Sequence, residues 1–271
     1  MARGWLDAED LRQIARLLPD LSCVRSLALA LNPQWISMKL PHHSTIPAAA
    51  VCFQDCEHTL SAAGYALHEA YAEKLWYEQR RVPPEPMSAI FFGKFFADDC
   101  ALRLYAAGEQ LADAVAAMME TDEPSLARYK KRFTSRQARI GAYLAVERPS
   151  DPTTTALTAL QQADGWQRTR NYRDFWVHEQ PPRVEGLGIS MRRGTRWTRT
   201  ESGWAMGLGS GDAPDLTVDE LLLFVRDGLL AFSRAFAAVL DQYIQRLASH
   251  GVTVTTQDRG DDRVTLSVHL L

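Results

Sequence analysis

The chain has 271 residues, of which 46% are hydrophobic and 23% are charged, and its formal net charge is −3. This composition excludes a fibrous, collagen-like or wholly disordered protein, and the length leaves room for one or two compact units. A net charge so close to zero also argues against binding to nucleic acid or to a membrane by bulk charge alone.

The amino-terminal segment lacks the basic start, apolar run and cleavage site of a secretory signal, so we expect a cytoplasmic protein. Charged residues interrupt the most apolar stretch, Leu221 to Ile244, which therefore lacks the roughly 20 uncharged residues of a membrane span. Four cysteines are too few for a disulfide scaffold in a chain of this length. We expect no membrane partner and a fold held together by packing.

The amino-terminal part of the chain carries apolar residues at helical spacing. A short amphipathic helix is predicted over 7–18, because Pro19 ends the pattern. Residues 20–50 contain three prolines and are predicted to be irregular. A helix over about 57–80 follows, closed by the proline pair at 83–84.

The central part continues the helical pattern. A long, proline-free helix is predicted over about 88–120, with Ser88 as its N-cap. Asp122, followed by a proline, indicates the start of the next helix, which continues to about Val146. A shorter helix over 153–163 is predicted to stop at Gly165.

The last predicted helix has the clearest start in the chain. Thr217 and Glu220 form a capping box, in which each side chain accepts a hydrogen bond from a backbone N–H of the first turn. The apolar pattern then runs to His250, and Gly251 is predicted to end the helix.

Two stretches favour β-structure instead, 186–208 and 252–270, because apolar and polar residues alternate around turn signals. These stretches are predicted to form a small antiparallel β element, which could be one sheet against the helices. No repeat, low-complexity tract or linker is visible. The sequence therefore predicts a mainly α-helical single domain over 1–271, with a hairpin insertion at about 184–210 and a C-terminal hairpin at about 252–270.

The charge is unevenly placed along the chain. The segment from Pro124 to Thr200 holds 15 basic and 6 acidic residues, a net charge of +9, which leaves −12 for the rest. Tryptophans and tyrosines lie between these arginines, as in surfaces that neutralise phosphates and stack bases. An equally good interpretation is a solvated face whose charges are balanced by acidic neighbours in space.

One segment could carry chemistry. Arg170, Asp174 and His178 follow one another in steps of four, so they share a face if the segment is helical. Asp174 would then accept a hydrogen bond from one nitrogen of His178 and leave the other to exchange protons near neutral pH. The guanidinium of Arg173 is a fork-shaped donor suited to phosphate, and Arg168 and Arg170 are further candidate phosphate or nucleotide ligands.

Together these groups would suffice to let a ribose 2′-hydroxyl attack a phosphodiester without a metal or cofactor. The alternative is a surface ladder of i,i+4 pairs, each contributing a few tenths of a kcal/mol.

The sequence Arg173-Asp-Phe-Trp-Val-His178 resembles the signature of the HEPN superfamily, the helical-bundle ribonucleases and nucleotide-binding proteins of bacterial toxin and defence systems. That signature is an Arg, usually followed by a polar residue, with a His after four to six intervening residues. The resemblance implies an up-and-down helical bundle, usually dimeric, with the motif at the dimer interface. It also implies that His178 is the general base, that Arg173 stabilises the phosphate and that Asp174 is their polar partner.

Two acidic residues fall on one stripe of the predicted helix over 88–120. Asp98 and Glu109 are spaced so that both carboxylates can point inward. A buried acid such as Glu109 could orient Arg173 or His178, although a buried acid paired with a structural arginine is at least as common.

Two hypotheses follow. The first is a HEPN-like protein that binds or cleaves RNA, as a homodimer, with Arg173 and His178 as phosphate ligand and base. The second is a non-catalytic helical bundle in which the same residues bind a nucleotide or lock a subunit interface. Neither hypothesis requires a metal. A zinc site is not expected, because no second pair of cysteine or histidine ligands follows Cys52, Cys56 and His58 at finger-like spacing.

Overall fold

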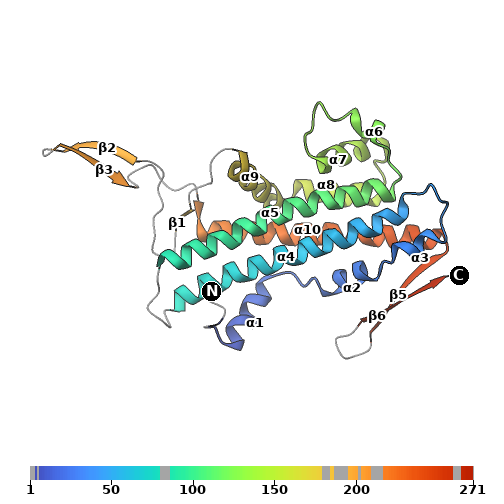
Figure 1. Ribbon diagram of the computed structural model, residues 1–271, viewed down its shortest axis with the longest axis horizontal. Coiled ribbons are helices and arrows are strands. Elements are labelled where there is room, and N and C mark those ends of the chain that lie inside the picture. Colours follow the sequence, from blue (N-terminus) through green and yellow to red (C-terminus); the bar gives the residue numbers. More distant parts are fainter. Residues whose placement is uncertain are drawn as a thin grey trace. The chain divides into compact units, whose positions relative to one another are not determined.

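A computed structural model of the chain describes residues 4, 6–79, 86–178, 184–185, 195–200, 203–208, 216–258 and 264–270. Within these ranges the protein is mainly α-helical, and bundle packing joins α4 to α5 and α9 to α10 (Figure 1). The helices described are α1 (Ala8–Leu17), α2 (Ser22–Ala30), α3 (Pro33–Ser37), α4 (Ile46–Gln79), α5 (Pro86–Met118), α6 (Glu123–Ala127), α7 (Arg136–Glu147), α8 (Pro152–Gln162), α9 (Asp164–His178) and α10 (Val218–Ser249).

The chain divides into two compact units, each assembled from three stretches. Unit 1 contains Met1–Leu18, Ala63–Leu102 and Asp164–Gly228, and unit 2 contains Pro19–Ala62, Arg103–Ala163 and Leu229–Leu271. The divisions fall inside α4, α5 and α10, so each of these three helices contributes residues to both units. The single domain predicted over 1–271 stays a prediction.

The core of unit 1 gathers α1, α4, α9 and the start of α10. Leu6 and Ile14 are buried together with Ala72 of α4. On α9, Trp166 is fully buried, and the ring of Tyr172 lies 5.7 Å from the ring of Phe224 on α10. These contacts fix which face of α9 points into the unit.

The core of unit 2 centres on aromatic rings from α4 and α10. The ring of Phe53 lies 5.0 Å from that of Tyr243 and 5.9 Å from that of Phe236. The Tyr243 hydroxyl donates to the carbonyl of Ile46 at 2.8 Å, so its polar end is satisfied inside the apolar cluster. The thiol of Cys56 donates to the carbonyl of Ala107 on α5.

Several predicted helices are confirmed. The structure adds two caps that were not predicted, since the Asp7 side chain accepts from two backbone N–H groups at the start of α1 and Asp151 caps α8. The predicted N-cap Ser88 is wrong, because α5 begins at Pro86. At the start of α10, Glu220 accepts from the backbone of Thr217 while the Thr217 hydroxyl accepts from the backbone of Glu220, as predicted. Gly251 has the positive φ of 77° that favours glycine just after a helix.

The prediction that residues 20–50 are irregular is wrong. The segment contains α2, α3 and the first turn of α4, because Pro33 and Pro47 lie where a helix tolerates a proline and Pro41 lies between α3 and α4. Pro33 occupies the first turn of α3, whose N-cap is Asn32, and Pro47 occupies the first turn of α4. A proline there removes only a backbone N–H that has no partner in the helix.

The single helix predicted from Asp122 to Val146 is also wrong, because the segment forms two helices, α6 and α7. Asp122 caps α6 as expected, but Ser135 caps a second start by accepting from the backbone of Ala138. A serine inside a helical pattern competes for backbone hydrogen bonds, and here the local cap is the arrangement formed.

The β-structure consists of separate two-stranded ladders rather than one sheet in the residues described. Strand β2 (Thr195–Thr200) pairs antiparallel with β3 (Gly203–Leu208), and β5 (Val252–Asp258) pairs antiparallel with β6 (Val264–Leu270). The predicted stretch 186–194 lies outside the described residues. An unpredicted parallel pair, β1 (Val184–Glu185) with β4 (Leu216–Thr217), joins the two ends of the segment that holds β2 and β3.

Candidate functional site

The segment from Asp164 to His178 forms the helix α9, which is the condition under which Arg170, Asp174 and His178 share a face. The predicted stop at Gly165 is wrong, because α8 ends at Gln162, with Ala163 as its C-cap, and Gly165 is buried inside α9. A Cβ on Gly165 would lie 2.6 Å from the Cβ of Asp227 on α10. Glycine is therefore present here because α9 and α10 approach closely.

The same helix contact is completed by Thr169 and Gly228. The Thr169 hydroxyl donates to the carbonyl of Gly165 at 2.7 Å and to the carbonyl of Phe224 at 3.1 Å. A Cβ on Gly228 would come within 2.5 Å of that hydroxyl oxygen. These small side chains hold α9 in one orientation against α10.

A buried acid on α5 anchors the other side of α9. The Tyr172 hydroxyl donates to Asp98, which also accepts from Lys94 and from the side chain of Trp176. Burial raises the pKa of the Asp98 carboxyl, an effect that Lys94 opposes. Burial, and then Asp98 itself, raise the pKa of the Tyr172 phenol. Of the two acids singled out in the sequence, Asp98 is the one that contacts α9.

Arg173, Asp174 and His178 lie together at the exposed end of α9. The Nη1 atom of Arg173 lies 2.9 Å from Oδ1 of Asp174 and 3.4 Å from Nε2 of His178. The Arg173 side chain is 18% exposed, whereas that of Asp174 is 47% exposed. The guanidinium thus bridges its two neighbours from a partly buried position, and the histidine is open to solvent.

This geometry differs in one respect from the expected one. The described hydrogen bond of Asp174 is with Arg173 and not with His178. A guanidinium can only donate, so a hydrogen bond between Arg173 and Nε2 requires that nitrogen to be unprotonated. The arginine, rather than the aspartate, is the group that faces the reactive nitrogen.

The other candidate phosphate ligands share the helix. The guanidinium of Arg168 lies 4.8 Å from the centre of the Phe224 ring, a cation–π contact that leaves the side chain exposed. Arg170 is half-buried and lies three residues before Arg173, so the two side chains project from neighbouring positions on the helix surface.

The predicted role of Glu109 finds no support among its described contacts. Glu109 belongs to unit 2, and its carboxylate accepts from the backbone N–H groups of Arg136 and Gln137 at the start of α7. A carboxylate at a helix N-terminus compensates the positive end of the helix dipole. These contacts give Glu109 a structural role at the start of α7, beside the N-cap Ser135.

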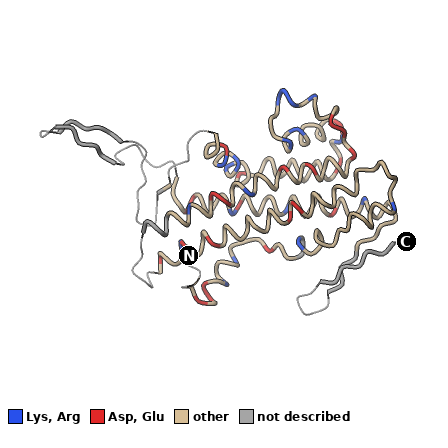
Figure 2. Tube along the Cα trace, in the orientation of Figure 1, with Lys and Arg blue, Asp and Glu red and all other residues tan. Residues whose placement is uncertain are grey.

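The basic middle segment does not belong to a single unit. Seven of its fifteen basic residues lie in unit 2 and eight in unit 1, and the side chains of the last five lie outside the described residues. In unit 2, Arg136 pairs with Asp113 and Glu123, and Arg128 pairs with Glu147. Figure 2 shows the acidic residues close to the basic ones around α6 and α7. For these side chains the balanced-charge interpretation is correct.

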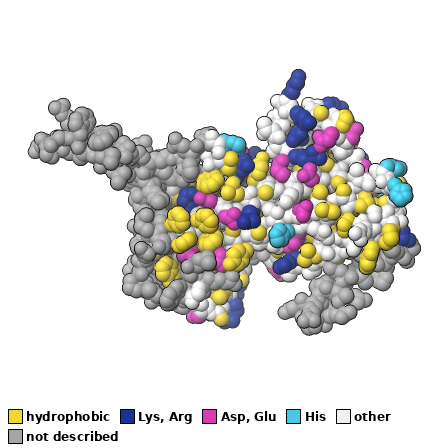
Figure 3. All heavy atoms as spheres, in the orientation of Figure 1, with side chains coloured by type: hydrophobic (Ala, Val, Ile, Leu, Met, Phe, Trp, Pro, Cys, Tyr) yellow, Lys and Arg dark blue, Asp and Glu magenta, His cyan; other side chains and the backbone are white. Residues whose placement is uncertain are grey.

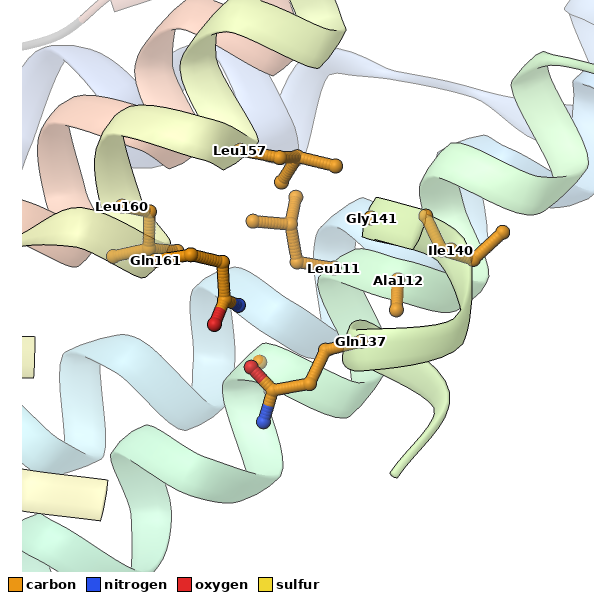
Figure 4. Close-up of a pocket in the computed structure, with 9 residues that line it drawn as sticks. Leu111, Ala112, Gln137, Ile140, Gly141, Leu157, Leu160 and Gln161 are labelled. Atoms are coloured by element: carbon orange, nitrogen blue, oxygen red, sulfur yellow. The ribbon is translucent and has the colours of Figure 1, made fainter. Parts of the chain in front are cut away.

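The part of the chain that the structure describes gives little support to other kinds of site. A cavity in unit 2, formed by α5, α7 and α8 and flanked by Gln137 and Gln161, has a volume of about 10 Å³ (Figure 4). That is room for one water molecule at most. Within the described ranges, no group of three His, Cys, Asp or Glu side chains is placed to hold a metal ion, and no helix is long and apolar enough to span a membrane.

Comparison with models of known protein families, with curated proteins and with solved structures found no match to this chain. The assignment of the candidate site therefore rests on its geometry. The sequence had indicated Arg173 and His178 but not the residues that position them, Thr169, Tyr172 and Gly228. A signal for Tyr172 was present, because it lies on the face of α9 opposite to the exposed polar positions.

Proposed function

We propose that this protein binds RNA through the exposed end of α9 and cleaves it, with Arg173 as the phosphate ligand and His178 as the general base. The observation that carries this proposal is the 3.4 Å approach of Arg173 Nη1 to His178 Nε2. A permanent cation and a proton acceptor within one hydrogen-bond distance are the two groups that an attack by a 2′-hydroxyl needs.

The proposed reaction begins when Arg173 exchanges one hydrogen-bond acceptor for another. A phosphate oxygen takes the place of Nε2 as acceptor from Arg173, which frees the lone pair of His178. The imidazole then removes the proton of the 2′-hydroxyl, the 2′-oxygen forms a bond to phosphorus, and the bond from phosphorus to the 5′-oxygen breaks. The products are a 2′,3′-cyclic phosphate and a 5′-hydroxyl that takes its proton from water, and the imidazolium of His178 then gives its proton to the hydroxide that remains. Asp174 keeps Arg173 oriented throughout.

The resemblance of Arg173 to His178 to the HEPN signature supports the same assignment, and with it a homodimer in which the two copies of the motif face one cleft. The end of α9 is open enough for such a partner, since Val177 is 42% exposed. Sedimentation velocity tests this part of the proposal. A protein that stays monomeric at micromolar concentration contradicts it.

A non-catalytic function is the alternative, and one observation favours it. Asp174 already pairs with Arg173, and Arg173 already contacts Nε2, so the three side chains bind one another in the free protein. Such an arrangement also suits a module that only binds a nucleotide or that locks a subunit interface. The two functions are distinguished by whether the protein cleaves RNA and whether that cleavage depends on His178.

The decisive experiment measures cleavage of a labelled single-stranded RNA of mixed sequence, with the same sequence as DNA in parallel. We expect wild-type protein to cleave the RNA but not the DNA, which lacks the attacking hydroxyl. His178→Ala should lower the rate roughly 10²- to 10⁴-fold, the usual contribution of a general base. Arg173→Lys keeps the charge but loses the fork, and should weaken RNA binding.

The matched control is His250→Ala, which removes another exposed histidine at the end of α10 in unit 2 and should leave cleavage unchanged. Wild-type protein that binds RNA without cleaving it supports the non-catalytic alternative. Cleavage that is equally fast in His178→Ala contradicts the catalytic assignment, and an absence of both binding and cleavage contradicts the function as a whole.

A further inference from the structure

The outer face of α9 carries four exposed side chains in one row. Arg168, Asn171, Phe175 and His178 follow one another in steps of three or four residues, which places them one above another along the helix. Phe175 stands out in this row because it is a large apolar side chain that is 51% exposed. It lies one helical turn from His178, whose Nε2 atom is 3.4 Å from Nη1 of Arg173.

The packing of the opposite face determines that this row points outward. Thr169 and Tyr172 are buried and hydrogen-bonded to α10 and α5, and the side chain of Trp176 is bonded to Asp98. A rotation of α9 that buried Phe175 would break these contacts. The exposure of the ring therefore follows from the way the helix is held.

The composition of the row indicates which partner it fits. An apolar protein partner would need a continuous apolar face, but here a cation, an amide and an imidazole lie beside the one aromatic ring. Figure 3 shows hydrophobic and charged side chains interspersed over the described part of the face that it presents. A nucleotide requires such a mixture, because its base stacks on a ring, its edge bonds to an amide and its phosphate binds a cation.

We propose that Phe175 stacks on an unpaired base of single-stranded RNA, beside the phosphate that Arg173 holds, with Arg168 contacting the backbone further along. This inference rests on the proposed function and names its substrate class. Bases in a duplex stack on one another and leave no face for the ring, so the site should prefer single strands.

The test is the affinity for a short, fluorescein-labelled single-stranded RNA with 2′-fluoro riboses, which lacks the attacking hydroxyl, measured by fluorescence anisotropy. Phe175→Ala should raise the Kd roughly 5- to 100-fold, the usual effect of losing one base–aromatic stack. Phe175→Leu keeps the apolar volume but not the π-face and should behave like alanine, whereas Phe175→Trp should bind at least as well as wild type. Trp35→Ala, which removes an aromatic side chain that is 46% exposed in unit 2, is the matched control.

The outcomes separate the two proposals. If wild type binds and Arg173→Ala weakens binding, but Phe175→Ala does not, the stacking inference is wrong and the proposed function stands. If Phe175→Leu retains full affinity, or the same RNA in duplex form binds equally well, stacking is likewise refuted. A change of oligomeric state in Phe175→Ala, seen by sedimentation, would make the ring a subunit contact instead. If wild-type protein binds no RNA, the proposed function itself fails.

Discussion

At the residue scale, Asp98 is a carboxyl whose properties are set by its surroundings. It is only 9% exposed and its pKa is raised by burial. The folded protein therefore keeps the proton on Asp98 to a higher pH than the unfolded chain does. The resulting stabilisation is complete below the usual pKa of aspartate and is lost as the pH rises through the raised pKa of the folded state.

The variant Asp98→Asn tests this, because its side chain does not titrate. We expect the free energy of unfolding of wild type, minus that of Asp98→Asn, to fall as the pH rises from 3 to 7. Urea denaturation at each pH measures both values, with Asp241→Asn on α10 as the reference for loss of an exposed carboxylate. A difference that grows with pH would mean that Lys94, Tyr172 and Trp176 outweigh burial.

Gly141 is a second residue whose effect follows from its surroundings. It lies inside α7, at the edge of the small cavity in Figure 4, and a Cβ placed on it meets nothing within 4 Å. Glycine in a helix interior costs roughly 0.5–1 kcal/mol relative to alanine. We expect Gly141→Ala to stabilise the protein by about that amount in urea denaturation. A loss of stability would contradict the open space described beside this position.

At the scale of elements, the contact between α9 and α10 depends on small side chains. We expect Gly228→Ala to destabilise the protein by about 1–3 kcal/mol, because its Cβ would overlap the hydroxyl of Thr169 and force the helices apart. The change is the same as at Gly141 and the predicted sign is opposite, so helix propensity alone does not account for both. Thermal and urea unfolding measure the effect.

A double-mutant cycle with Thr169→Ala checks the mechanism. Removal of the hydroxyl takes away the atom that the new methyl group would meet, so the double variant should lose less stability than the sum of the two single variants. Strict additivity of the two losses would show that Gly228 and Thr169 act independently.

At the scale of the whole molecule, the two compact units share three long helices. Cys56 in unit 2 and Cys100 in unit 1 are both 0% exposed, and burial raises the pKa of the Cys56 thiol well above its usual value. Labelling of either thiol therefore requires local opening. Because helix formation is cooperative, we expect opening in one unit to disrupt the shared helices and expose the other.

Single-cysteine variants that retain only Cys56 or only Cys100 measure this coupling. In a single cooperative domain, the opening free energies obtained from their labelling rates should agree within about 0.5 kcal/mol, the usual tolerance for independent measurements of one transition. Values that differ by several times that amount would contradict the predicted single domain and indicate two units that open separately.

The sequence by itself determined those features that depend on neighbours along the chain. The caps at Asp122 and Thr217, the stop at Gly251 and the spacing from Arg173 to His178 all involve atoms within a few residues of each other, and such short-range patterns can be recognised in a linear sequence. The mainly α-helical fold follows from the same patterns.

Only the tertiary structure decided which side chains meet across the fold. Asp98 and Tyr172 are 74 residues apart, and Thr169 and Phe224 are 55 residues apart. Neither pairing can be recognised from spacing, because it depends on how the helices pack. The packing likewise assigned Gly165 to a helix contact rather than a helix stop, and it placed the Glu109 carboxylate at the start of α7. The proposed chemistry of Arg173 and His178 thus begins in a local pattern, but the orientation that exposes it is a property of the packed helices.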